Sequence, residues 1–146
     1  MKVKRKVILI QGAFDILNWG HVKALQMAKS KGDYLIVALN SNELLWKYKK
    51  RAPVLPWGQK VFILRSLKYV DKVIMAKNFS PLELLKKYKV DIYCLTREWK
   101  HTKNQEIKYI HDTGGETIFL PRFKGGIPTS EIKKILLEEA KDGYME

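Results

Sequence analysis

This chain of 146 residues has little cysteine, no long apolar run and few acidic residues, and each absence excludes a class of protein. Its single cysteine, Cys94, rules out an internal disulfide, and no group of Cys and His residues has metal-ligand spacing. Because Cys94 falls within an apolar run, we expect an inert thiol in the core. Apolar runs such as residues 7–10 are far shorter than the ~20 residues of a membrane span. The stretch after the basic residues 1–6 is also too short for a signal peptide. We therefore expect a soluble, cytoplasmic protein without a metal site of its own.

The charge balance indicates an anionic partner. The chain has 28 Lys and Arg against 15 Asp and Glu, a net charge of +13, which favours nucleic acid, acidic lipid or phosphorylated small molecules. Many of these cations, including Lys133 and Lys134, fall on expected helix faces, where solvated surface is the simpler interpretation. The densest run, residues 47–51, lies on an expected loop. With Trp46 and Tyr48 beside it, this run suits either RNA or a phosphate pocket, and composition leaves both open.

Strand-like and helix-like segments alternate along the chain. Apolar runs rich in β-branched residues occur at 6–11, 34–40, 72–76, 91–95 and 116–120. Segments of helical period occur at 21–31, 60–69, 81–88, 103–112 and 129–140. This alternation predicts an α/β fold, a Rossmann-like, doubly wound parallel sheet of about five strands with flanking helices. With no internal repeat and no linker, residues 1–146 are expected to form a single domain.

In such a sheet, ligands bind beyond the carboxyl ends of the strands, so the segment after the first strand is a candidate site. Gly12 lets the backbone turn close to a ligand, and the following helix, expected to start near Trp19 or Gly20, offers N–H groups to an anion. His21 in its first turn is able to hydrogen-bond a phosphate oxygen. The alternative is that His21 only fills the helix start. The dinucleotide-binding fingerprint GxGxxG is absent.

Four segments together resemble a known family. Gly12-Ala-Phe-Asp-Ile-Leu-Asn-Trp-Gly-His21 resembles the G-x-F-D-x-x-H-x-G-H segment of the cytidylyltransferase-like nucleotidyltransferases. The likeness continues at residues 32–41, at residues 53–60 (P-V-x-P-x-E-Q-R in the heptose enzymes of the family) and at residues 120–130 (L-P-R-T-x-G-I-S-T-T). These segments cover most of the chain in the family's order, and they are most similar to its glycerol-3-phosphate cytidylyltransferase and heptose-phosphate adenylyltransferase branches.

The resemblance implies a reaction. A phosphate oxygen of a sugar or polyol phosphate attacks the α-phosphate of CTP or ATP, and pyrophosphate leaves without a covalent enzyme intermediate. Mg²⁺ is expected to arrive with the triphosphate, and a homodimer is expected from the family. Membrane association is not expected.

The resemblance also implies site residues, carried over by position. His21 matches the second motif histidine, Asn18 stands where the first is expected, and Arg122 matches the arginine that contacts the triphosphate. A lysine reaches the phosphates in this family, and both Lys47 and Lys49 are candidates. The expected catalytic residues are His21, Asn18, Lys49 and Arg122. The expected nucleotide-binding residues are Gly12, Ala13, Phe14, Asp15, Gly20, His21, Lys47, Thr96, Trp99, Arg122, Thr129 and Ser130.

Departures from the family pattern leave alternatives open. An amide at Asn18 donates hydrogen bonds but carries no charge, and residues 96–99 read Thr-Arg-Glu-Trp where the family has Gly-Asp-Asp-Trp or Gly-Gly-Asp-Tyr. The choice between CTP and ATP is therefore open. Thr129 and Ser130 also fit an ordinary helix N-cap. Two further functions are weighed, a nucleotide-binding relative that has lost turnover and a nucleic-acid-binding domain.

Overall fold

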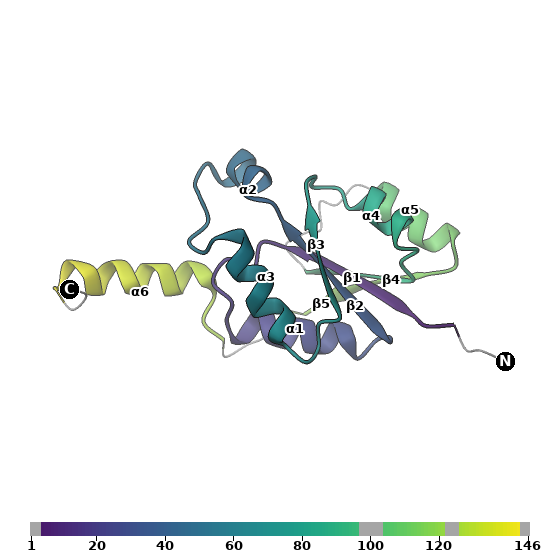
Figure 1. Cartoon of the computed structure of the whole chain (residues 1–146), viewed down its shortest axis with the longest axis horizontal. Helices are drawn as coiled ribbons and strands as arrows, with labels where there is room; N and C mark the ends of the chain where they lie inside the picture. Colours follow the sequence, from purple (N-terminus) through teal and green to yellow (C-terminus); the bar gives the residue numbers. More distant parts are fainter. Residues whose placement is uncertain (1–3, 97–103, 122–125, 144–146) are drawn as a thin grey trace.

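The computed structural model describes residues 4–96, 104–121 and 126–143, and Figure 1 shows their arrangement. The strands are β1 (Val7–Gly12), β2 (Tyr34–Asn40), β3 (Lys72–Ala76), β4 (Ile92–Thr96) and β5 (Glu116–Leu120). The helices are α1 (Trp19–Lys29), α2 (Asn42–Lys49), α3 (Trp57–Ser66), α4 (Leu82–Lys87), α5 (Asn104–Asp112) and α6 (Thr129–Lys141). All five expected strands are present, and each of the five expected helices overlaps an observed one.

The five strands form one parallel sheet in the order β3-β2-β1-β4-β5. Strand order reverses between β1 and β4, because the chain moves outward from β1 to β2 and β3 and then returns to the other side of β1. The Rossmann-like fold predicted from the sequence is confirmed. The loop that follows β1 lies at this reversal, where a ligand is expected.

Helices cover both faces of the sheet, as Figure 1 shows, with α1 and α3 on one side and α4 and α5 on the other. On the first face, Ile8, Ile10 and Val37 pack with Leu25 of α1 and Leu64 of α3. On the second face, the alternate residues of the same strands pack with α4 and α5; they include Leu9, Ile36, Ala38, Leu85 and Ile110. Because successive side chains of a strand point to opposite faces, the nearly continuous apolarity of β1 and β2 follows from burial on both sides.

Aspartates fix the register at the amino ends of the strands. Each aspartate directly precedes a strand. Its carboxylate accepts a hydrogen bond from a backbone N–H of the neighbouring strand, or from the residue directly before that neighbouring strand. The pairs are Asp33 with Lys6 (2.8 Å), Asp71 with Leu35 (2.7 Å) and Asp91 with Val7 (2.9 Å). The amino edge of the sheet is thus closed by structural carboxylates, whereas the basic and amide groups gather at the carboxyl edge.

Helix α2 corrects the expectation that the basic run at residues 47–51 lies on a loop, because Lys47 and Lys49 belong to this helix. Ser41 caps it, with its hydroxyl accepting from the backbone N–H of Leu44 at 3.1 Å. Leu44 is buried, and the helix ends at Lys50 in the left-handed conformation (φ 55°). The apolar face of α2 is short, so the basic residues around it dominate the sequence pattern and favour a loop.

Helix α6 projects from the body of the molecule (Figure 1). None of its residues is buried, and Ile135, Leu136 and Leu137 are among its exposed apolar side chains. No helix within the described residues is long and apolar enough to cross a membrane.

Candidate functional site

Phe14 and Gly12 shape the loop after β1. Phe14 has a positive φ of 45°, in the left-handed region that side-chain-bearing residues seldom adopt. Its ring folds back so closely that a Cβ on Gly12 would lie 2.9 Å from the ring, which explains the glycine. The same ring lies 5.4 Å from the His21 ring, centroid to centroid. The loop therefore packs Phe14 beneath the start of α1 and fixes the position of His21.

Asn18 and His21 form a reciprocal cap at the start of α1. The Asn18 side chain accepts from the backbone N–H of Gly20 at 3.0 Å, and the Asn18 backbone N–H donates to His21 Nδ1 at 3.2 Å. Because Nδ1 accepts this bond, a neutral His21 carries its proton on Nε2, and Nε2 is then the donor atom. The helix thus starts at Trp19, within the range expected from the sequence.

A hydrogen bond joins the start of α1 to the start of α6. Asn18 Nδ2 donates to Thr129 Oγ1 at 3.2 Å and to the Ile16 carbonyl at 2.9 Å, so the amide bridges two loops as well as capping a helix. The N-cap role considered for Thr129 and Ser130 is wrong. Both are inside the first turn of α6, whose N-cap is Pro128 and makes no side-chain cap bond. The amino ends of α1 and α6, where the helix dipoles are positive, therefore lie close together.

Gly126 holds the segment before α6 against α1. A Cβ at this position would lie 2.6 Å from Cε3 of Trp19 and 3.7 Å from the backbone nitrogen of Gly20. No other residue allows this approach without displacing the indole. Gly126 thus has a packing role that the sequence motifs do not indicate.

Asp15 joins three segments of the site. This carboxylate, 6% exposed, accepts from Leu55 N at 3.1 Å and from Lys133 Nζ of α6 at 2.9 Å. Burial acts to raise the pKa of Asp15, but hydrogen bonds from Lys133 and from the backbone of Val54 and Leu55 outweigh it, and the pKa is lowered from its usual value.

The interpretation of Lys133 as solvated surface is therefore wrong, since only 18% of its side chain is exposed. It lies four residues after Thr129, one helical turn further along the same face of α6, and that spacing was the available signal.

Further cations surround this carboxylate. Lys60 of α3 is 1% exposed and donates from Nζ to the Ala13 carbonyl at 3.2 Å. Burial lowers the pKa of Lys60; the charge of Asp15 opposes this, and the charges of Lys49 and Lys133 add to it. A small recess beside Ala13 and Asp15 is lined by Lys49 and Arg51 together with Lys133.

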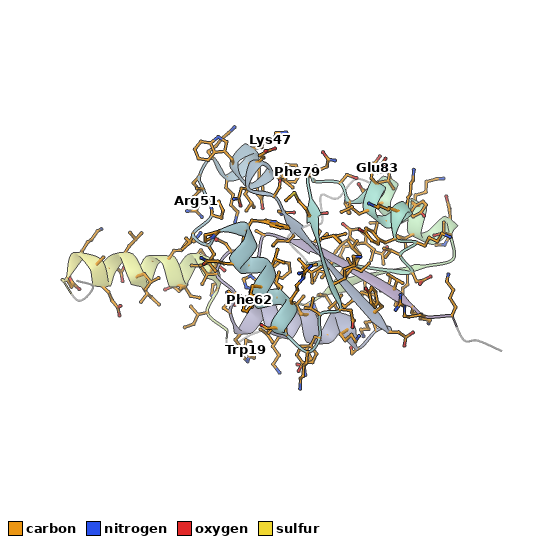
Figure 2. All side chains as sticks on the ribbon, viewed as in Figure 1. Trp19, Lys47, Arg51, Phe62, Phe79 and Glu83 are labelled. Carbon is orange, nitrogen blue, oxygen red and sulfur yellow. The ribbon has the colours of Figure 1, made fainter. Side chains whose placement is uncertain are left out.

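Of the two candidate lysines in α2, the structure brings Lys49 to the first loop. Lys47 is exposed and lies on the outer side of α2, whereas Arg51 lies near the start of α6 (Figure 2). Ser130 is exposed as well. Trp99 and Arg122 lie outside the described residues, and Thr96 is described only as the last residue of β4.

The groups that the structure brings together are donors and cations at the carboxyl edge of the sheet. They comprise two helix N-termini, an imidazole and four basic side chains around one carboxylate. Within the described ranges, no group of three or more His, Cys, Asp or Glu residues is placed to hold a metal ion. Such a constellation, at the strand-order reversal, is typical of α/β proteins that bind phosphorylated ligands.

Residues 9–135 match the family model described as cytidylyltransferase-like, and the chain belongs to this family. It is 32% identical over 130 residues to glycerol-3-phosphate cytidylyltransferase of Bacillus subtilis (strain 168), covering 88% of this chain and 95% of that protein. It is 33% identical over 137 residues to the bifunctional protein HldE of Shigella sonnei (strain Ss046), covering 93% of this chain and 28% of HldE. The chain is thus a nucleotidyltransferase.

A solved structure shares the fold. The lipopolysaccharide core biosynthesis protein from Thermoplasma volcanium GSS1 superposes with a TM-score of 0.68 over 83% of this chain and 98% of that one. Its sequence identity is 23%, so the likeness concerns the fold alone.

Proposed function

We propose that this enzyme transfers a nucleoside monophosphate from CTP or ATP to a phosphorylated sugar or polyol and releases pyrophosphate. The names of its relatives support the substrate class. One relative, matched over 95% of its length, is a glycerol-3-phosphate cytidylyltransferase. The observation that carries the proposal is the Asn18–Thr129 hydrogen bond of 3.2 Å. It joins the helix start that bears His21 to the start of α6, so that two anion-binding helix ends serve one ligand.

In the proposed reaction, a phosphate oxygen of the acceptor forms a bond to the α-phosphorus of the triphosphate. The bond from that phosphorus to the pyrophosphate oxygen breaks, and pyrophosphate leaves with the electron pair. His21 donates from Nε2 to an oxygen of the α-phosphate, where negative charge increases in the transition state. Lys49 and the N–H groups at the start of α6 bind the departing phosphates, and Arg122 is proposed to join them on the strength of the resemblance.

We propose that Mg²⁺ enters with the triphosphate as part of the substrate. Asp15, the carboxylate of the first loop, already accepts from Lys133 and from the backbone, so its oxygens serve the protein rather than an ion. Asn18 contributes by position: its amide is engaged in capping α1 and in bonding Thr129, which holds His21 and α6 in place.

A pyrophosphate-release assay tests the proposal, crossing CTP and ATP against a panel of sugar and polyol phosphates in the presence of Mg²⁺. We expect acceptor-dependent release with one nucleotide. His21→Ala should leave the chain folded, with about 1 kcal/mol of stability lost because the capping bond from the Asn18 N–H is removed. It should lower turnover by roughly 10²–10³, the cost of losing one transition-state donor. Unchanged turnover in that variant would remove His21 from the mechanism.

The alternative, a relative that binds nucleotide without turning it over, has a different outcome in the same assay. Nucleotide would then raise the melting temperature while no acceptor in the panel gave release. Asn18→His would decide what the substitution at the motif does. A higher rate would show that the amide limits turnover, and a lower rate would show that the site depends on the Asn18–Thr129 bond.

We also propose that the enzyme is a homodimer, as expected from the resemblance. The exposed apolar side chains of α6, Ile135, Leu136 and Leu137, are surface that a second subunit would cover. Light scattering after size exclusion gives the mass directly, and a monomer at all accessible concentrations would exclude the dimer.

A further inference from the structure

Two side-chain amides end otherwise apolar strands on the face of the sheet that α4 and α5 cover. Gln11 is the penultimate residue of β1 and Asn40 is the last residue of β2. By strand alternation both share the face of Leu9 and Ala38, opposite to α1. Both lie at the carboxyl edge of the sheet.

These amides are only half satisfied. Gln11 Nε2 donates to Asn40 Oδ1 at 3.0 Å and to the Asn78 carbonyl at 2.9 Å, which fixes the orientation of both amides. Asn40 is fully buried, and Gln11 is half-buried. In the described part of the chain, Gln11 Oε1 and Asn40 Nδ2 are screened from solvent and have no hydrogen-bond partner.

The two atoms without a partner are an acceptor, Gln11 Oε1, and a donor, Asn40 Nδ2, on neighbouring side chains. A buried polar atom without a partner costs free energy, so sequences seldom retain two of them side by side unless another molecule completes them. A hydroxyl group both donates and accepts, and one hydroxyl, or two adjacent ones, satisfies both atoms. The amides carry no charge, so they recognise neutral hydroxyls rather than an ammonium group.

The surroundings suit a polyol or sugar. The Phe79 carbonyl lies 3.4 Å from Gln11 Nε2, and the Phe79 ring meets the Tyr48 ring of α2 edge to face, with centroids 4.8 Å apart. Figure 2 shows Phe79 beside α2, above the end of β3. The two rings, 40% and 45% exposed, thus form an apolar surface on the segment whose backbone contacts Gln11. Apolar walls with a few placed polar groups are typical of small-molecule sites.

We propose that Gln11 and Asn40 bind a hydroxyl group of the phosphorylated acceptor and so select neutral polyhydroxylated acceptors. This assignment rests on the proposed function and names the chemistry of its second substrate. The phosphate of the acceptor faces His21 at the first loop, and its hydroxylated end faces the amide pair on the α4 side.

The test compares an acceptor with its analogue that lacks one hydroxyl, using the full chain and the nucleotide that supports turnover. Gln11→Met keeps the length of the side chain but removes both hydrogen-bonding groups. We expect it to raise the KM for the hydroxylated acceptor roughly tenfold, a factor that corresponds to about one hydrogen bond, and to bring the discrimination against the deoxy analogue close to one. The nucleotide KM should change less than twofold.

Gln26→Met is the matched control, because Gln26 is exposed on α1 and the chemical change is the same. Gln11→Glu serves as a second variant if Gln11→Met does not fold. It is expected to raise the relative kcat/KM for phosphoethanolamine, whose ammonium group pairs with a carboxylate.

The outcomes separate the two proposals. Turnover by the wild type with unchanged acceptor discrimination in Gln11→Met, or equal changes in the acceptor and nucleotide KM, overturns the assignment of the amide pair alone. No release by the wild type with any acceptor, despite nucleotide binding, overturns the proposed function, and the amide assignment falls with it.

Discussion

Replacement of Lys133 by Met should loosen α6 and weaken nucleotide binding together. The side chain of Lys133 joins α6 to the first loop through the 2.9 Å contact with Asp15, and the other polar contact described above is the Asn18–Thr129 bond. Because α6 has no buried residue, these contacts carry much of its attachment. Met retains the length and the apolar stem of Lys133 and removes only the charged donor.

The magnitude follows from burial. Breaking a fully buried ion pair costs roughly 3–5 kcal/mol, whereas an exposed pair contributes about 0–1 kcal/mol. This pair lies between those limits, since the side chains of Lys133 and Asp15 are 18% and 6% exposed. Asp15 also keeps its backbone donors at Val54 and Leu55. We expect a loss of about 2 kcal/mol, the scale of a hydrogen bond to a charged group, and a melting temperature roughly 4–8 °C lower.

Urea unfolding at pH 7 measures the loss, and a titration with triphosphate measures affinity on the same samples. Lys134→Met is the matched control, because Lys134 is the neighbouring exposed lysine of α6 and should change stability by less than about 0.5 kcal/mol. Asp15→Asn and the double variant complete a cycle whose coupling energy should be about 1–2 kcal/mol. If Lys133→Met and Lys134→Met unfold alike, the Asp15 contact does not hold α6, and the reasoning fails.

Three further predictions concern ionisation. Because the pKa of Asp15 is lowered in the folded protein, its stabilising contribution is complete above the unfolded pKa of about 3.9 and is lost as pH falls through the folded value. Urea unfolding between pH 3 and 6 should thus be less pH-dependent in Asp15→Asn. Burial raises the pKa of Cys94 to about 12, so a thiol reagent at pH 8 should label Cys94 only when urea unfolds the chain. Lys60, whose pKa burial lowers, should be favoured in its charged form by a bound triphosphate. Nucleotide affinity should therefore fall as pH rises through that lowered pKa, and Lys60→Met should flatten the dependence; an equal slope in both proteins would exclude Lys60.

The sequence predicted the sheet because burial on two faces demands continuous apolar runs, and all five appear at the expected places. It missed α2 because charge density at residues 47–51 outweighed a shorter signal, the Ser41 cap followed by the buried Leu44 and Leu45. The helix start at Trp19 was predictable from Asn18, whose side chain is a strong N-cap.

The contacts within the site were less predictable. Lys133 lies 118 residues after Asp15, and the two pair only because α6 docks against the first loop. The local sequence pattern contains no information about that docking. The resemblance pointed to Asn18 as a weakened donor to phosphate. The structure shows its amide bonded to Gly20, Ile16 and Thr129, which are partners that only the folded chain brings together.

The charge arrangement connects stability with ligand binding. Asp15 is the one carboxylate that the described contacts place among Lys49, Lys60, Arg51 and Lys133, so these cations exceed their local counter-charge. Folding concentrates this excess at the carboxyl edge, and the mutual repulsion opposes the folded state. A polyphosphate removes that repulsion when it binds, so part of its binding free energy is repulsion stored by the fold. Composition alone did not decide whether the basic residues behind the net charge of +13 are solvated surface or part of a binding site. The structure places four of them in the site.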